Sequence, residues 1–301
     1  MKGVLTTRID PSYDDLPETR YHFPHAYLNQ VKAAIGDQII YYEPGRSNDA
    51  GARGGRKAYF AVATVATVEP DQNIDGHYYA KIEDYLEFDE AVPFKVGDQT
   101  LEGALQKEDG TYNKGAFRRA VRNIPDIEFQ AILSMGFRHG MLDFVPDVIA
   151  AEPASADGFF EASAEFERPI IQVTQNRLFR DRAFARRVKQ VYDRRCAFTG
   201  LRLINGLGRP EVQAAHIMPV SAHGPDSVRN GLALSSTFHW MFDRGLISLT
   251  DEFEFLIAKN QIPSEISSLL NRDGCAHVPD TGLEKPHASF LRHHRENVFK
   301  G

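Results

Sequence analysis

The sequence has few cysteines and no long apolar run. Only Cys196 and Cys275 occur among its 301 residues, which excludes a framework of disulfide bonds and a zinc site with four cysteine ligands. No apolar stretch approaches the about 20 residues that cross a bilayer, and the first 15 residues lack the apolar centre of a signal peptide. We therefore expect a globular cytoplasmic protein without a membrane partner.

Charge is divided unevenly along the chain, with an excess of acidic residues before residue 168 and an excess of basic residues after it. Residues 168–301 hold 19 Lys and Arg against 13 Asp and Glu, whereas residues 1–167 hold 16 against 28. The net charge of -6 thus combines a strongly acidic part with a basic one. A basic part suits a polyanionic partner such as nucleic acid.

The composition changes between these two parts. Residues 148–167 are rich in Ala, Ser, Glu and Gly, which is typical of a linker. We predict one domain over residues 1–150, a linker over 151–167 and a second domain over 168–301. Each domain is long enough to bury its own core.

The first domain has the pattern of a β-rich fold. Its first twenty residues are polar with two prolines and predict a loose lead-in, so that order begins at Tyr21. Aromatic and β-branched stretches then predict strands near 39–42, 58–71 and 78–94, and a helix follows Pro125. Strands separated by turn signals favour an α+β fold, a small β-barrel with flanking helices.

The second domain begins with a basic amphipathic pattern. Apolar residues between Leu178 and Val191 recur at helical spacing, while Arg and Lys, including Arg186 and Arg187, occupy the other face. That face is either simply solvated or contacts phosphates.

Residues 213–250 carry the chemistry. An apolar strand ends at His216, a polar loop leads to Asn230, a second strand follows, and then a helix that Ser236 or Thr237 caps and Gly245 ends. His239 and Asp243 are four residues apart on that helix, so they share one face and can converge on one divalent ion.

These residue types suit phosphodiester cleavage. A neutral imidazole can take a proton from water, and a hard metal ion can stabilise the charge that develops on the leaving oxygen. His216 suits the first role and the His239/Asp243 pair suits the second. The amide of Asn230 can tie the polar loop to the motif. His223, in the same loop, has no assigned role.

Residues 196–250 resemble the HNH endonuclease family of the bacterial restriction type, which has a ββα-metal fold. The segments AAHIMP, NGLALS and HWMFDRGLISL match in order and spacing, RCAFTG precedes them, and LRHHRENVF resembles the ending of that branch. The resemblance implies a DNA-cleaving hydrolase with His216 as general base, Asn230 as structural residue and His239 as metal ligand.

Two departures from the family pattern matter. Many HNH enzymes have an acidic metal ligand immediately before the base, where this chain has Ala215, so we assign that duty to Asp243. Paired CxxC clips are also missing, so we expect no structural zinc. The expected cofactor is Mg²⁺ or a similar divalent ion such as Mn²⁺, held by few protein ligands and several waters.

The segments YHFPHAYL, GDQIIYYEP and YFAVATVATVEPD resemble the PUA-like superfamily, which includes the SRA and EVE domains. The resemblance implies a reader of modified bases that are flipped out of DNA, which needs aromatic faces and polar groups. The candidate pocket residues are Tyr21, Phe23, Tyr41 and Tyr42, although for any one aromatic a place in the core is about three times as common as a place in a pocket. Candidate phosphate contacts on a Gly-rich loop are Arg46, Arg53 and Arg56.

Together these features predict a modification-dependent endonuclease that acts on double-stranded DNA carrying 5-methylcytosine or 5-hydroxymethylcytosine. Arg229 and Arg244, with the basic helix, are expected to hold the DNA backbone. One alternative is an HNH nuclease without modification dependence, and another is a non-catalytic nucleic-acid binding protein. Cleavage of both strands would require two copies of a single-site nuclease, which is compatible with a homodimer.

Overall fold

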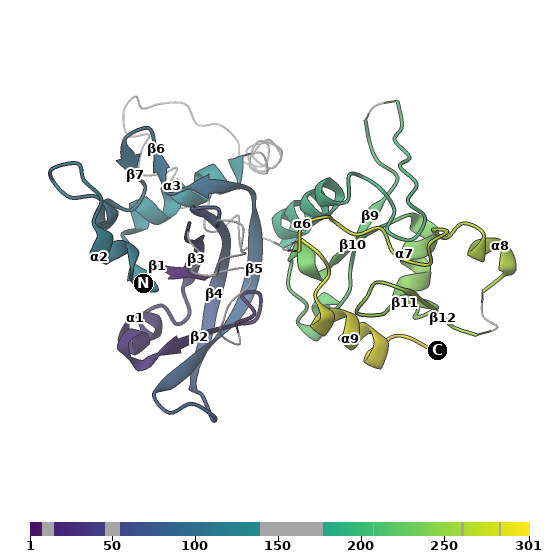
Figure 1. Cartoon of the computed structure of the whole chain (residues 1–301), viewed down its shortest axis with the longest axis horizontal. Coiled ribbons are helices and arrows are strands. Elements are labelled where there is room, and N and C mark those ends of the chain that lie inside the picture. The colour runs from purple at the N-terminus through teal and green to yellow at the C-terminus, as the bar shows by residue number, and fades with distance from the viewer. Residues whose placement is uncertain (8–14, 46–54, 139–176, 207, 260–261, 283) are drawn as a thin grey trace, which may run out of the picture. The chain divides into compact units, whose positions relative to one another are not determined.

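The computed structural model describes residues 1–7, 15–45, 55–138, 177–206, 208–259, 262–282 and 284–301. The chain forms two compact units, Met1–Arg180 and Asp181–Gly301 (Figure 1). The predicted linker, residues 151–167, lies outside the described residues. No helix in the described part of the chain is both long enough and apolar enough to cross a membrane.

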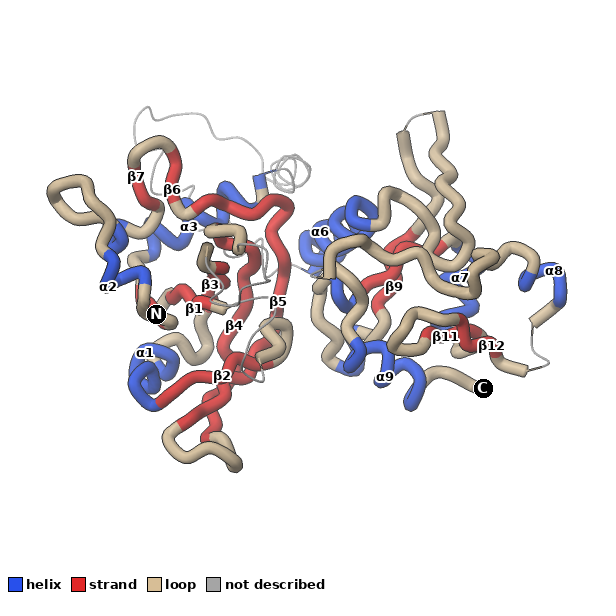
Figure 2. The backbone as a smooth tube through the Cα atoms, viewed as in Figure 1, coloured by secondary structure: helices blue, strands red, loops and turns tan. Residues whose placement is uncertain are grey.

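Unit 1 is built on one six-stranded mixed sheet that curls into a half-barrel (Figures 1 and 2). Its strands in spatial order are β2 (Arg20–Pro24), β5 (His77–Pro93), β4 (Ala58–Pro70), β3 (Gln38–Glu43), β1 (Gly3–Thr6) and β8 (Val121–Asn123). As described, the sheet has two edges, β2 and β8, so it is not a closed barrel. The three predicted strands correspond to β3, β4 and β5. β3 and the first six residues of β4 are buried throughout, which agrees with their runs of β-branched and aromatic residues.

Short elements complete this unit. They are η1 (His25–Tyr27), α1 (Leu28–Lys32), β6 (Lys95–Val96), β7 (Gln99–Thr100), η2 (Gly103–Leu105), α2 (Lys114–Phe117) and α3 (Asp126–Gly136). Helix α3 is the helix predicted after Pro125. It buries Phe129, Ile132 and Leu133, and two acidic residues in its first turn complement the positive end of the helix dipole.

The expectation of a loose lead-in is wrong for β1. Val4 and Leu5 are 0% and 1% exposed, and β1 pairs in parallel with β3 and antiparallel with β8. Four residues are too few to show the alternation of apolar and polar residues that marks a strand. Parallel pairing with a strand over 30 residues away also leaves no turn signal nearby in the sequence. Order therefore begins near the first residue rather than at Tyr21.

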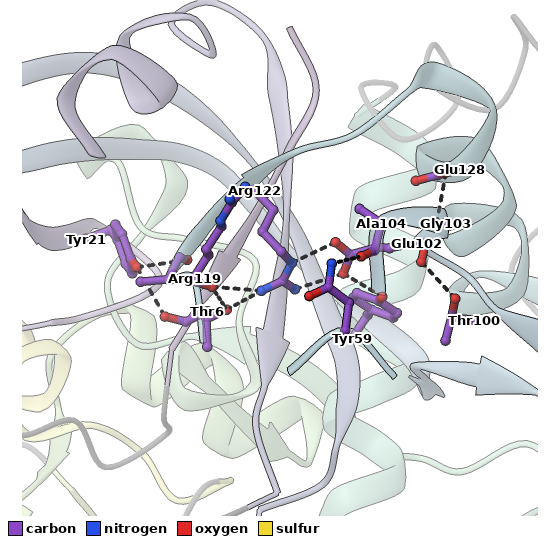
Figure 3. A network of polar contacts seen from close by, with 12 residues as sticks. Thr6, Tyr21, Tyr59, Thr100, Glu102, Gly103, Ala104, Arg119, Arg122 and Glu128 are labelled. Atoms are coloured by element: carbon purple, nitrogen blue, oxygen red, sulfur yellow. Dashed lines mark hydrogen bonds and ion pairs between the residues drawn. The ribbon is translucent and has the colours of Figure 1, made fainter. Parts of the chain in front are cut away.

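A buried ion pair lies at the far edge of this sheet (Figure 3). Arg122 donates to both carboxylate oxygens of Glu102 over 2.7 and 2.8 Å, and the Tyr59 hydroxyl donates to the same carboxylate over 2.7 Å. Burial, together with the Glu102 charge, raises the pKa of Tyr59. Burial likewise raises the pKa of Tyr42, whose ring faces the Arg122 guanidinium, to about 12. The pair is bidentate and almost fully desolvated, which makes the loss of one partner costly.

We expect Glu102→Ala to lower the free energy of unfolding of unit 1 by about 3–5 kcal/mol, because it leaves the Arg122 charge buried without its carboxylate. Hydrogen–deuterium exchange of β1 and β8 in the full chain measures this loss. Glu69→Ala is the matched control: Glu69 is 58% exposed and 3.9 Å from Lys81, so the change should stay within about 0.5 kcal/mol. Equal exchange in the two variants would contradict the expectation.

Unit 2 contains two two-stranded sheets and four helices in its described part (Figure 1). Its elements are most of α6 (Arg177–Val191), β9 (Gln213–His216), η3 (Val220–Ala222), η4 (Val228–Asn230), β10 (Gly231–Leu234), α7 (Ser236–Asp243), β11 (Ile247–Leu249), β12 (Phe255–Ile257), α8 (Ser264–Ser267) and α9 (Ala288–Asn297). The order strand, loop, strand, helix over β9, β10 and α7 agrees with the sequence prediction.

Gly245 ends α7 as predicted. Its φ is +71°, and a Cβ there would lie 1.9 Å from the carbonyl oxygen of Val298. Only glycine tolerates both conditions. The segment after α9 therefore packs directly on the end of the helix that carries His239 and Asp243.

Candidate active site

The two strands of the motif place the first histidine. β9 and β10 pair antiparallel, with His216 opposite Gly231 and Ala215 opposite Leu232. Ala215 is 1% exposed, so its side chain lies in the core. His216 ends the strand, and its side chain is 18% exposed.

The loop between these strands is clamped by one side chain. The Asn230 carboxamide accepts from the amide of Met218 over 2.8 Å and donates to the carbonyls of Met218 and Pro225 over 3.0 and 2.9 Å. Asn230 is 0% exposed, so these bonds replace all of its water contacts. Gly224 allows the loop to close, because a Cβ there would lie 1.8 Å from the Met218 carbonyl oxygen.

His216 has two contacts that the sequence did not predict. Its Nε2 lies 3.0 Å from Oδ1 of Asp226, whose side chain is 1% exposed. Its ring stacks on Phe184 of α6, with 3.9 Å between ring centroids and 12° between planes. The sequence places Asp226 in a Gly-Pro-Asp turn, and nothing in that pattern separates a buried carboxylate from an exposed turn residue.

A cavity of about 430 Å³ brings the two parts of the motif together. Its walls come from β9, the loop after it, α7, α9 and the segment after α9. The lining residues are Ala214, His216, Ile217, Pro219, Val220, His239, Asp243, His294 and Val298. His216, His239 and Asp243 thus face one space, whereas His223, which is exposed and has a φ of 62°, does not line it.

His239 and Asp243 fit a divalent ion. His239 Nε2 and Asp243 Oδ2 lie 3.5 Å apart, which is less than the about 4 Å that two ligands of one ion can span when each lies about 2.1 Å from it. Asp243 is 52% exposed, so water and a substrate oxygen can complete the coordination. No group of three or more His, Cys, Asp and Glu suited to a metal occurs in the described part of the chain.

Two residues support helix α7, Gln213 at the start of β9 and Glu211 two positions before it, and sequence reasoning missed both. Gln213 Oε1 lies 2.9 Å from His239 Nδ1, which fixes that nitrogen as the donor and leaves Nε2 for a ligand. Glu211 accepts from the Ser236 amide over 3.0 Å. The predicted cap is therefore wrong: Ser235 is the N-cap residue, and the carboxylate of Glu211 replaces a side-chain cap.

The predicted DNA-contacting arginines have different surroundings. Arg244 faces the half-exposed Trp240 ring over 4.8 Å. Arg187 lies 2.5 Å from Glu284, and Arg56 donates to Glu43 over 2.7 Å, so both already have carboxylate partners. Arg186 and Arg229 are half-buried. Arg46 and Arg53 lie outside the described residues.

The four predicted pocket aromatics do not line one pocket. All are buried, at 3% exposure or less. Tyr21 and Phe23 stack on each other, and Tyr41 belongs to the same core cluster. Tyr42, the next residue on β3, lies against Tyr59 and Arg122 instead. Neighbouring residues on a strand point to opposite faces, so a shared pocket is excluded for Tyr41 and Tyr42.

His294 of α9 forms part of the cavity wall and is neutral at ordinary pH. It is 2% exposed, its Nε2 lies 3.0 Å from the Phe242 carbonyl, and Ser248 Oγ lies 2.8 Å from its Nδ1. Burial lowers the pKa of His294 to about 4. In the unfolded chain its pKa would be about 6.5, so the unfolded state binds the proton first as pH falls.

We therefore expect unit 2 to lose stability as pH falls from about 6.5 toward 4, by about 3 kcal/mol from this one side chain. The contribution is fully present above pH 6.5. Urea unfolding at pH 7.5 and pH 5 measures it, and His294→Gln should flatten the dependence. His293→Gln, at the partly exposed neighbour, should keep most of the dependence, because burial is the largest cause of the lowered His294 pKa and the His293 charge is a smaller one. A flat profile in the unmodified protein would refute the assignment.

A histidine at the end of a strand shares a cavity with a His/Asp pair on a helix, which is the arrangement expected of a ββα-metal site. Residues 196–250 match the family described as HNH endonuclease. The chain thus carries an HNH endonuclease domain and is a DNA-cleaving hydrolase. HNH nucleases generally use a divalent metal ion.

Comparisons over the whole chain give distant likenesses. The structure "Modification dependent TagI restriction endonuclease" is 15% identical over 98% of this chain and 81% of that chain, with a TM-score of 0.30. "Structure of the Type IV phosphorothioation-dependent restriction endonuclease ScoMcrA" is 11% identical over 99% of this chain and 57% of that chain, with a TM-score of 0.22. At these TM-scores neither likeness carries a functional argument. No curated protein matches the chain.

Proposed function

We propose that His216 is the general base of a modification-dependent DNA endonuclease and that His239 and Asp243 hold its divalent metal ion. One observation carries the catalytic part of this proposal: the three side chains line the same cavity of about 430 Å³ although they come from two elements of the motif. The cavity is open to water at the exposed Asp243, so a phosphate of the DNA backbone can reach it.

The roles follow from the contacts. His216 is held at its edge by Asp226 and on its face by Phe184, so its ring has little freedom to turn away from a water molecule. Asn230 keeps the loop closed around this arrangement. When bound, Mg²⁺ or Mn²⁺ would neutralise charge on the phosphate and on the leaving oxygen.

DNA is the substrate of this class, and the surface beside the cavity suits it. Trp240 and Arg244 lie one position along α7 from His239 and Asp243, so they form the adjacent row on the exposed side of the helix. A guanidinium beside an aromatic face can contact a phosphate and a sugar or base together. We assign backbone contact to Arg244, Arg186 and Arg229.

For unit 1 we propose a PUA-like reader of modified cytosine. The support is an aromatic cluster around Tyr41, which stacks on Phe60 with 5.8 Å between ring centroids and lies 6.0 Å from the Tyr85 ring. The Tyr41 hydroxyl is buried and has no hydrogen-bond partner among the described residues. Aromatic faces next to a hydroxyl without a partner are what a flipped base requires. Tyr42 is not part of this proposal.

The deciding experiment compares cleavage of unmodified, 5-methylcytosine and 5-hydroxymethylcytosine plasmids in Mg²⁺ and in Mn²⁺. Faster cutting of a modified plasmid supports the proposal. Equal cutting of all three would favour an HNH nuclease without modification dependence, and the absence of nicking in either metal would favour a non-catalytic DNA-binding protein. If two copies act together, linear product should rise more steeply than enzyme concentration.

A further inference from the structure

Asp226 is a buried carboxylate that touches the general base. Its side chain is 1% exposed, and its Oδ1 lies 3.0 Å from His216 Nε2. A buried carboxylate is costly unless hydrogen bonds satisfy it, and an ionised one can only accept them. The contact therefore assigns the proton of a neutral His216 to Nε2 and leaves Nδ1 with the lone pair that a base needs.

Asn230, the asparagine that clamps the loop, also fixes the distance between His216 and Asp226. Asn230 binds both the amide and the carbonyl of Met218, two residues after His216, and it binds the carbonyl of Pro225, the residue before Asp226. The Ile217 amide donates to the Asn230 carbonyl over 2.9 Å, which ties the base's strand to the same residue. His216 and Asp226 are thus attached to one rigid frame.

Asp226 is not placed to be a metal ligand. It does not line the cavity that His216, His239 and Asp243 share, and it is far less exposed than Asp243. Its contact is on the Nε2 edge of the imidazole. The contact through which the carboxylate can act on the reaction is the one with His216.

We propose that Asp226 is a positioning residue: its carboxylate fixes the tautomer and orientation of His216, and Asn230 sets the distance between them. This proposal rests on the proposed role of His216 as base. In the reaction, water loses a proton to Nδ1 of His216, the oxygen of that water bonds to phosphorus, and the bond from phosphorus to the leaving oxygen breaks. The leaving oxygen departs with the electron pair of that bond and takes a proton from solvent. The imidazolium that forms retains its Nε2 proton, which it donates in a hydrogen bond to the Asp226 carboxylate.

The test combines kinetics with nuclear magnetic resonance of the ¹⁵N-labelled imidazole in the full chain. The unmodified protein at pH 8 should show a protected proton on His216 Nε2. Asp226→Ala should expose that proton to rapid exchange and lower kcat by about 10–100-fold, by analogy with other residues that orient a functional histidine, with KM little changed. Asp226→Asn, which keeps the side-chain volume, is the second variant if the alanine variant unfolds.

Ser227→Ala is the matched control, because Ser227 is the buried neighbour of Asp226 in the same loop, has no carboxylate, and accepts from the Arg229 amide over 3.1 Å. It should keep the Nε2 proton and kcat. The proposal is overturned if the Asp226 variants keep the normal kcat and the protected Nε2 proton. It is also overturned if Ser227→Ala lowers kcat and exposes the proton as much as the Asp226 variants do, because the effect would then come from the structure of the loop. A third outcome separates this proposal from the general-base role. If His216→Ala cuts DNA normally, and the Nε2 proton of His216 in the otherwise unmodified chain still depends on Asp226, then the general-base role fails and the contact between the two residues stands.

Discussion

His216→Ala should cut DNA about 10²–10⁴-fold more slowly than the unmodified protein while its affinity for DNA changes by less than about threefold. The expected loss is that of a general base, because the variant keeps the metal ligands but has no group to take the proton of the attacking water. Single-turnover cleavage of a labelled duplex measures the rate, and fluorescence anisotropy measures the binding.

The control for this variant lies in the same loop. His223→Asn removes an exposed imidazole, and asparagine tolerates the φ of 62° at this position. It should cut at the normal rate, because His223 does not line the cavity. Normal cutting by His216→Ala would show that another group activates water.

His239→Ala should lose cleavage by about 10³-fold or more, with a loss of Mn²⁺ binding that calorimetry detects without DNA. A metal ion contributes several kcal/mol to the stabilisation of charge, and in the proposed site His239 would supply a nitrogen ligand beside Asp243. Asp243→Asn should raise the metal concentration needed for half-maximal cleavage, since water can replace part of an exposed carboxylate's role. The comparison assigns the two ligands separately.

Glu252→Gln controls for the loss of a negative charge, because Glu252 is an exposed carboxylate in the same unit. It should leave the metal dependence unchanged. If His239→Ala keeps both its Mn²⁺ affinity and its rate, then the metal lies elsewhere and the His239/Asp243 contact is only an ion pair on the helix surface.

The sequence predicted what is local. The spacing of His239 and Asp243 on a helix, the strand that ends at His216 and the glycine that ends α7 all follow from periodicity and turn chemistry within a few residues. Residues such as Asp226, Gln213 and Phe184 were missed, because their roles depend on burial and on segments 10, 26 and 32 residues away from their histidines.

Unit 1 shows the same limit. The strands β3, β4 and β5 are long enough to reveal their composition, whereas β1 is four residues long and pairs with distant partners. The sequence offered Tyr41 and Tyr42 for the same pocket because both are aromatic. Their alternation across β3, together with Arg122 on one side only, separates them.

The close approach of the backbone at Gly224 affects whether nuclease activity can be inferred from the HNH motif residues alone. Any side chain at this position would meet the Met218 carbonyl oxygen and the Asn230 amide. A homologous chain could therefore keep His216, Asn230 and His239 yet be inactive, because the loop that joins them could not close. Surveys that count the three motif residues would score such a chain as a nuclease, so the residue at the Gly224 position should be read together with them when genomes are searched.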